Sequence, residues 1–268
     1  MSPTEREHYT HGHHESVLKS HSWRTVENSA AYLIPRLTAG LSVLDLGCGP
    51  GTITVDLADR VAPGRVVGVD AAAEVILKAR ALGESHPNAE FLVGDAYALD
   101  FPDDSFDLVH AHQMLQHVGD PVAVLREMRR VAKPGGAVAA RDVDYGGTVW
   151  YPPLPGLKHW MELSQQVQRS NGGEPNAGRR LKAWAMAAGF GEVTATASIW
   201  AFTNAEDRAW WGGMWAQRVL ESAFAGDVLG KGLAGQDELE GISAAWSRWA
   251  AADEATLFMP HGEIIALA

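Results

Sequence analysis

The stretch VLDLGCGPG, residues 43–51, sets a short, mostly apolar run directly before three glycines that are spaced one residue apart. An apolar run that ends abruptly in glycines indicates a buried β-strand followed by a tight turn. Because Gly47, Gly49 and Gly51 have no side chains, their backbone N–H groups and the start of the next helix can approach a ligand closely. We therefore expect a ligand to lie against this turn.

Strand-like and helix-like segments alternate outward from the turn. The sequence predicts strands over 41–46, 65–70, 90–95, 106–112 and 136–144, and helices over 51–61, 72–83 and 120–132. Asp120 and Pro121 favour a helix start, as an N-cap acid followed by proline in the first turn. This alternation predicts an α/β fold whose mostly parallel sheet is covered by helices on both faces.

The composition changes near residue 145, and nine of the ten tryptophans lie at or after Trp150. We expect a helix over 176–190, a strand over 191–202, helices over 206–223 and 235–251, and a final strand over 255–268. One or two helices are expected within 14–37. The resulting division is an N-terminal helical lid (1–37), a Rossmann-like core (38–202, with a substrate-side insertion at 145–176), a helical cap insertion (203–254) and a final core strand (255–268).

Charge and cysteine content exclude several classes of protein. The net charge of −11 and the absence of a long basic run argue against nucleic acid as a partner, and favour a neutral or cationic small molecule. The single cysteine excludes an internal disulfide and a cysteine-based metal cluster. We expect no metal site at the histidines of the N-terminal segment, no membrane span and a cytoplasmic location. A homodimer remains open.

Three carboxylates lie at the ends of predicted strands and define the kind of ligand. The glycine pattern lacks the spacing of a dinucleotide-binding turn, and Asp45 just before it would repel phosphate but suit an ammonium group. Asp70 can accept hydrogen bonds from two ribose hydroxyls, and Asp95 can accept one from an adenine amine. A nucleoside that carries an amino acid and no phosphate would use all three carboxylates.

Four motifs, in this order, resemble those of the class I S-adenosylmethionine-dependent methyltransferases: VLDLGCGPG, VVGVD, VGDAYALDFPDDSFDLVHAHQMLQHVGDP and VAKPGGAVAARD. The resemblance covers roughly residues 40–145 and is strongest to the small-molecule group that includes the ubiquinone and menaquinone C-methyltransferases. It implies S-adenosyl-L-methionine as the cofactor. It also implies a Rossmann-like, seven-stranded, mainly parallel sheet with one antiparallel strand near the end, helices on both faces and a helical cap.

The resemblance also implies which residues bind the cofactor. The glycine turn would run alongside the methionine part of the cofactor, and Asp45 would position the ammonium group through water. His112 and Gln113 would line the side of the cavity that faces the sulfonium. A histidine departs from the small residue that is common at this position in the family, so its role stays open. The remaining implied contacts are the turn residues Gly47, Cys48, Gly49 and Gly51, the ribose site at Asp70 and Ala71, and the adenine site at Asp95 and Ala96.

The N-terminal helices have two interpretations. As a lid, they would fold over the cofactor, with Tyr9 beside it and Arg24 meeting its carboxylate through a charge-assisted contact. As a surface element, they would only pack on the sheet. Cys48 likewise has a structural alternative, because a small side chain inside a turn often serves packing alone.

Methyl transfer mainly requires alignment of the acceptor and exclusion of water, with at most one general base. The candidates are His117, ranked first, and then His112, Asp144 and Tyr145. The structural alternative for His117 is a helix histidine with a satisfied hydrogen bond. Several aromatic residues suit a core individually, but as a group we expect some to line a cavity for an aromatic or apolar acceptor: Trp150, Tyr151, Trp160, Trp210, Trp211 and Trp215.

The sequence therefore predicts transfer of a methyl group to a small organic acceptor by in-line displacement at the sulfonium, with methylation of carbon or oxygen favoured. One alternative is a catalytically inactive cofactor-binding or structural protein of the same fold. A nicotinamide-dependent oxidoreductase is a weaker alternative, because the turn lacks the dinucleotide spacing.

Overall fold

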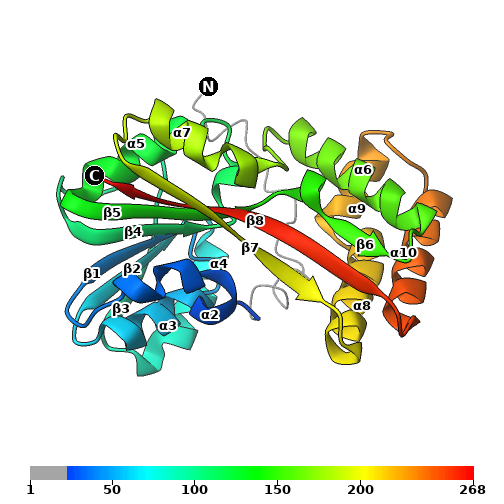
Figure 1. The fold of residues 1–268 in the computed structure, drawn as a ribbon, viewed down its shortest axis with the longest axis horizontal. Helices are drawn as coiled ribbons and strands as arrows, with labels where there is room; N and C mark the ends of the chain where they lie inside the picture. The colour runs from blue at the N-terminus through cyan, green and yellow to red at the C-terminus, as the bar shows by residue number, and fades with distance from the viewer. Residues whose placement is uncertain (1–22) are drawn as a thin grey trace.

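The computed structural model describes residues 23–268 and has a mixed β-sheet at its centre (Figure 1). Within this part of the chain eight strands pair in the order β3-β2-β1-β4-β5-β8-β6, and β7 also pairs with β8. The pairs among β1 to β5 are parallel, whereas β8 runs antiparallel to β5, β6 and β7. The strands are β1 Ser42–Leu46, β2 Arg65–Asp70, β3 Ala89–Val93, β4 Phe106–His112, β5 Ala132–Val143, β6 Val149–Tyr151, β7 Val193–Phe202 and β8 Thr256–Leu267.

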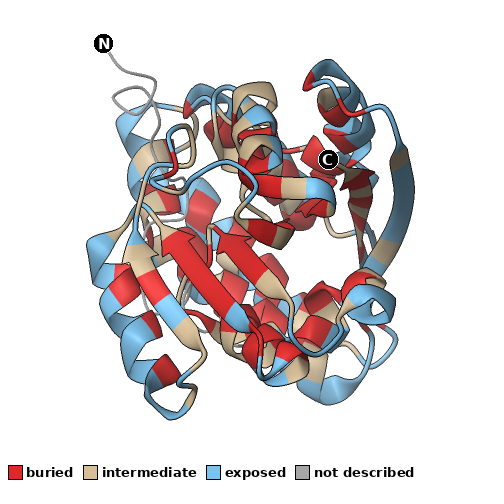
Figure 2. Cartoon of the chain, turned by 90° about the vertical axis from the view of Figure 1, so that its left-hand side faces the viewer, coloured by how far each residue is buried: buried red, intermediate tan, exposed pale blue. Residues whose placement is uncertain are grey.

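Helices cover both faces of this sheet. On one face Leu44 and Val109 belong to a core that includes α5 and α7, and on the other Val43 and Leu108 pack with α2 and α3. Figure 2 shows the central strands buried between helices whose outer surfaces are exposed. The α-helices are α2 Val26–Ser29, α3 Thr52–Val61, α4 Ala73–Leu82, α5 Pro121–Val131, α6 Pro155–Ser170, α7 Leu181–Ala187, α8 Ala205–Glu221, α9 Ala223–Gly230 and α10 Gln236–Ala251. The short 3₁₀ helices are η2 Ala31–Arg36, η3 Gly83–Ser85, η4 Leu115–His117, η5 Tyr145–Gly147 and η6 Ala177–Arg180.

Local sequence signals begin two of the helices that frame the sheet. Gly51 is the N-cap of α3 in a left-handed conformation with φ of 89°, which glycine adopts without steric cost. The Asp120 carboxylate accepts a hydrogen bond of 2.9 Å from the backbone N–H of Ala123, and Pro121 occupies the first turn of α5. The tight turn after β1 and the predicted start near 120 are therefore present.

A second hydrophobic core lies at the far end of β7 and β8, where α6, α8, α9 and α10 gather (Figure 1). Its centre is a cluster of fully buried tryptophan rings. The ring centroid of Trp160 lies 4.7 Å from that of Trp215 and 4.8 Å from that of Trp246. Aromatic pairs in this edge-to-face arrangement stabilise a core beyond the effect of buried area alone.

The fold class is the predicted one, with a reversed strand, β8, near the end of a mostly parallel sheet. The three-residue strand β6 adds to the seven expected strands, and α6 and α9 were not predicted. The helix predicted over 176–190 is divided into η6 and α7. None of the helices between residues 23 and 268 is both long and apolar enough to cross a membrane.

Candidate active site

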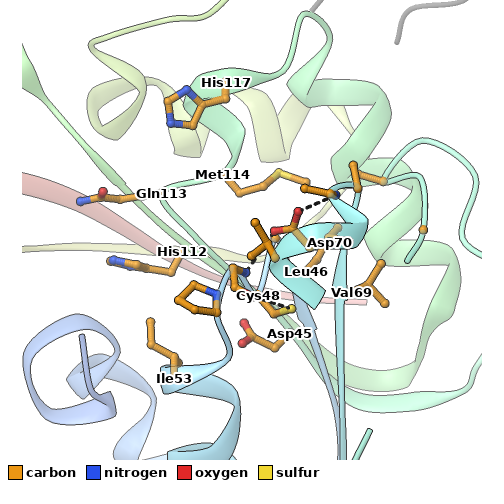
Figure 3. Close-up of a pocket in the computed structure, with 18 of the residues that line it drawn as sticks. Asp45, Leu46, Cys48, Ile53, Val69, Asp70, His112, Gln113, Met114 and His117 are labelled. Carbon is orange, nitrogen blue, oxygen red and sulfur yellow. Dashed lines mark hydrogen bonds between the residues drawn. The ribbon is translucent and has the colours of Figure 1, made fainter. Parts of the chain in front are cut away.

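A cavity of about 360 Å³ opens at the carboxyl ends of the parallel strands (Figure 3). It lies where the strand order reverses between β1 and β4, which is the usual ligand position in such sheets. Apart from Gly51, all sequence-predicted cofactor residues in the described chain line it: Arg24, Asp45, Gly47, Cys48, Gly49, Asp70, Ala71, Asp95, Ala96, His112 and Gln113. His117 also lines the cavity, whereas Tyr9 lies outside the described residues.

The glycine turn forms the floor of the cavity and leaves no room for side chains. Gly47 has φ of 72°, and a Cβ atom there would lie 2.6 Å from Cγ of Met114. A Cβ atom at Gly51 would lie 2.8 Å from the ring of Phe91, so this glycine is needed for packing below the turn. The Cys48 thiol is buried, and burial raises its pKa well above the ordinary value, so the sulfur stays protonated.

Asp70 is held by the turn that it faces. One carboxylate oxygen accepts a hydrogen bond of 3.0 Å from the backbone N–H of Gly49, and the other accepts one of 3.0 Å from Ala72. Figure 3 shows this carboxylate between the turn and the start of α4. A carboxylate oxygen can accept more than one hydrogen bond, so both oxygens can still bind ligand hydroxyls.

Asp45 is almost fully buried, with 2% of its surface exposed. Its carboxylate accepts a hydrogen bond of 2.6 Å from the Thr54 hydroxyl and lies 2.8 Å from Nδ1 of His110. Two polar partners satisfy a carboxylate that would otherwise be costly to bury. Sequence reasoning missed His110, although Asp45 and His110 are directly opposite in the pairing of β1 with β4.

Asp95 and Ala96 form the outer wall of the cavity, in the loop after β3. Asp95 is exposed, and its carboxylate accepts a hydrogen bond of 2.9 Å from the backbone N–H of Tyr97. The three cavity carboxylates of Asp45, Asp70 and Asp95 therefore lie at the carboxyl ends of three adjacent strands, on one side of the cavity.

The opposite wall comes from the end of β4, the loop after it and the N-terminal segment. Gln113 has a positive φ of 50°, and its side-chain oxygen accepts a hydrogen bond of 2.8 Å from Nη2 of Arg24. The amide nitrogen of Gln113 lies 2.8 Å from Nε2 of His261. Since Nδ1 of His261 lies 3.1 Å from the carbonyl oxygen of Met259, we assign its proton to Nδ1 and the acceptor role to Nε2. His261 was not predicted.

His112 is buried, and neither ring nitrogen has a hydrogen-bond partner among the described residues. Burial lowers its pKa well below the ordinary value, and repulsion by Arg24 and Arg141 lowers it further. For His117, burial and then Arg24 lower the pKa to about 3. Both imidazoles are therefore neutral near pH 7.

These buried imidazoles predict a loss of stability in mild acid. The pKa values of His112, His117 and His261 are all lowered, chiefly by burial. Below pH 6.5 these three side chains therefore bind protons in the unfolded chain but not in the folded chain. Asp142 opposes this effect, because burial raises its pKa to about 8 and the folded state keeps its proton. The net expectation is a decrease of about 3 kcal/mol in the free energy of unfolding between pH 6.5 and 5.

Urea denaturation at several pH values measures this free energy, and His261→Asn should reduce its dependence on pH by about one proton. A stability that stays constant or rises on acidification over this interval would contradict the assignment of three neutral buried imidazoles.

Two predicted base candidates lie away from the cavity. Both carboxylate oxygens of Asp144 accept hydrogen bonds of 2.5 Å from the guanidinium of Arg179. Tyr145 is buried in the tryptophan core, with its ring 6.4 Å from that of Trp160, and burial raises its pKa. Neither residue lines the cavity, so a direct role in catalysis stays a prediction that this geometry does not favour.

The aromatic residues that were expected to line an acceptor cavity also lie away from this cavity. Trp160, Trp211 and Trp215 belong to the second core, Trp150 and Trp210 pack against it, and Tyr151 is 55% exposed. None of these residues lines the cavity of about 360 Å³. For these residues the structural interpretation applies.

Comparison with known proteins agrees with the geometry. The family model described as methyltransferase domain matches residues 37–205. An uncharacterized methyltransferase of Schizosaccharomyces pombe is 35% identical over 275 aligned positions, which cover 98% of this chain and 97% of the relative. A demethylmenaquinone methyltransferase of Lactococcus lactis is 42% identical over 127 residues, which cover 46% of this chain and 48% of the relative.

A phosphoethanolamine N-methyltransferase of Haemonchus contortus, solved with phosphomonomethylethanolamine and S-adenosylhomocysteine, has a similar fold. Its TM-score is 0.55 at 18% identity, and the match covers 90% of this chain and 52% of that one. The family match and the full-length relative identify the chain as a member of the S-adenosylmethionine-dependent methyltransferases with a Rossmann-like fold.

Proposed function

We propose that this methyltransferase acts on a small organic molecule and methylates carbon or oxygen rather than nitrogen. The observation that carries the proposal is one cavity with two unlike walls. One wall holds three carboxylates around a glycine turn, and the other holds two imidazoles that are neutral near pH 7. The first wall suits the cofactor, and the second suits an acceptor that must lose a proton.

The residues of the first wall fit S-adenosylmethionine. The turn residues Gly47, Cys48 and Gly49 line the cavity, and the Met114 side chain occupies the place where a Cβ atom of Gly47 would lie. The carboxylate of Asp70, fixed by two backbone N–H groups, would bind the ribose hydroxyls. Asp45 would face the ammonium group, and Asp95 with Ala96 would contact the adenine. When bound, the cofactor supplies an electrophilic methyl group on a sulfonium.

The residues of the second wall would position the acceptor and take up its proton. His112 is the better placed base, because both of its ring nitrogens lack partners in the described structure and it lines the cavity. Gln113 is held in one orientation by Arg24 and His261, so it forms a rigid part of the wall. A largely buried wall also excludes water, which strengthens these polar contacts.

The division into a core, a lid and a cap belongs to this proposal. Trp23 packs against the rings of Trp200 and Trp210, at 5.1 and 5.3 Å, while the next residue, Arg24, lines the cavity. The start of the described chain is thus attached to the second core by Trp23 and contributes Arg24 to the cavity. This arrangement supports a lid formed by the N-terminal helices and a cap formed by the helices of the second core.

Turnover tests the proposal. Purified protein is incubated with S-adenosylmethionine and a panel of phenols, enols and amines, and S-adenosylhomocysteine is measured. We expect turnover with acceptors methylated at oxygen or carbon. Cofactor binding without turnover on any acceptor would favour the inactive alternative, and turnover on amines alone would overturn the preference for oxygen or carbon.

His112→Asn should lower kcat about 100-fold with such an acceptor, because it removes the base. The affinity for S-adenosylhomocysteine should change little. His159→Asn, on the remote helix α6, is the matched control and should retain full activity. A variant at His112 with unchanged kcat would exclude this residue as the base.

A further inference from the structure

The charges of the cavity are divided between its two walls. Among residues 23–268, the carboxylates that line it are those of Asp45, Asp70 and Asp95, and they belong to the wall formed by the ends of β1, β2 and β3. The polar side chains of the facing wall in the described structure are Arg24, His112, Gln113 and His117. An acceptor lying between the cofactor and this wall would face a guanidinium and two imidazoles, and no carboxylate from the described part of the chain.

The guanidinium of Arg24 is fixed in position on that wall. It donates a hydrogen bond of 2.8 Å to the side-chain oxygen of Gln113, and it lies over the ring of Trp200 at 5.7 Å from the centroid. Gln113 presents its oxygen to Arg24 because its amide nitrogen is engaged with His261, whose own orientation is set by a backbone carbonyl. A chain of hydrogen bonds from β8 thus holds the cation beside the two histidines.

Two guanidinium groups act on His112 from different sides. Arg24 reaches it from the N-terminal segment, and Arg141 is its direct neighbour across the pairing of β4 with β5. Both cations disfavour the protonated form of His112, and Arg24 does the same for His117. His261 and His110 would oppose a charge on His112 only in their protonated forms. Glu263 lies 3.3 Å from Arg141 and pairs with it, so Arg24 is the cation that acts most directly on a bound ligand. This end of the cavity therefore disfavours another positive charge and stabilises a negative one.

We propose that the acceptor is acidic at the group to be methylated, a phenol, an enol or a carboxylic acid, and that it binds as its anion beside Arg24. The inference rests on the proposed function and specifies its substrate class. The net charge of −11 suggests a neutral or cationic partner, but distant surface charges are screened over about 10 Å, whereas Arg24 lines the site.

The reaction balances without a further reactant. The acceptor loses its O–H proton as it binds: a ring nitrogen of His112 accepts the proton and passes it to solvent, which leaves the anion beside Arg24 and His112 neutral. A lone pair of the acceptor oxygen, or the nucleophilic carbon of an enolate, forms the bond to the methyl carbon. The electron pair of the S–CH₃ bond stays on sulfur, so the products are the methylated acceptor, S-adenosylhomocysteine and one proton.

Three probes of matched shape test this inference on protein saturated with S-adenosylhomocysteine: 4-nitrophenol, 4-nitroaniline and 4-nitrobenzylamine. The absorbance of 4-nitrophenol reports its ionisation directly. We expect the bound phenol to ionise at a lower pH than the free phenol, and to bind at least about 10-fold more tightly than the neutral or the cationic probe.

Arg24→Met should abolish this preference while it changes the affinity for S-adenosylhomocysteine by less than about 3-fold, and Arg24→Lys should retain most of it. Arg36→Met, on the exposed surface of η2, is the control and should leave the preference intact. If Arg24→Met instead weakens S-adenosylhomocysteine binding and leaves the phenol preference unchanged, the cation serves the cofactor carboxylate and the inference is wrong.

Tighter binding of the amine, an unshifted ionisation of the bound phenol, or no phenol binding at millimolar concentration would each contradict the inference too. These results differ from a failure of the proposed function, in which S-adenosylhomocysteine itself would not bind to the unaltered protein.

Discussion

Asp70→Ala should weaken the binding of S-adenosylhomocysteine about 100- to 1,000-fold. The carboxylate is already oriented by the backbone N–H groups of Gly49 and Ala72, so little freedom is lost when it accepts two ribose hydroxyls. Hydrogen bonds to a charged group contribute about 1.5–3 kcal/mol each, and two of them account for this loss of affinity. Isothermal titration calorimetry measures the dissociation constant directly.

Asp100→Ala removes an exposed carboxylate and is the matched control, with an unchanged affinity expected. Asp70→Asn should weaken binding nearly as much, because one amide nitrogen would face a backbone N–H donor. Thermal unfolding of each unliganded variant shows whether the turn itself remains folded. If a folded Asp70→Ala protein binds S-adenosylhomocysteine within a factor of three of the original, the assigned ribose site is wrong.

Trp160→Ala should lower the free energy of unfolding by about 3–5 kcal/mol, which is typical of deleting a large buried aromatic side chain. Trp160 has no exposed surface and contacts the rings of Trp215 and Trp246. Because other large rings surround the site, the neighbours cannot collapse to fill the space without leaving their own contacts. Urea denaturation monitored by circular dichroism gives the free energy.

Met186→Ala truncates a side chain that is 61% exposed, and we expect a change within about 0.5 kcal/mol. Trp160→Phe should cost less than the alanine variant because part of the aromatic packing remains. A decrease below 1 kcal/mol for Trp160→Ala would mean that the tryptophan cluster adds little to the stability of the chain.

The framework was predictable because its signals are local. An apolar run before Gly47 marks a strand and a turn, and the acid–proline pair at Asp120 marks a helix start, whatever the rest of the chain does. Asp45, Asp70 and Asp95 could be grouped because the carboxyl ends of parallel strands meet at one edge. The helix α9 was not predicted because Gly226 and Gly230 lie within its eight residues. The start of α6 lacks the side-chain N-cap that Asp120 gives α5, although Pro155 lies in its first turn.

The partners of the site residues could not be predicted, because they depend on register and on long-range contacts. Asp45 meets His110 only through the alignment of β1 with β4, and Gln113 meets His261 across a sequence separation of 148 residues. Alternation does not reveal these pairings. Nor does spacing show whether a tryptophan such as Trp160 faces a ligand or another ring.

A crystal structure of the protein with S-adenosylhomocysteine tests the central claim most directly. We expect the ribose hydroxyls to hydrogen-bond to Asp70, the adenine to lie beside Asp95 and Ala96, and the sulfur to face His112 across the glycine turn. Density for the ligand elsewhere, or its absence from this cavity at saturating concentration, would contradict the account.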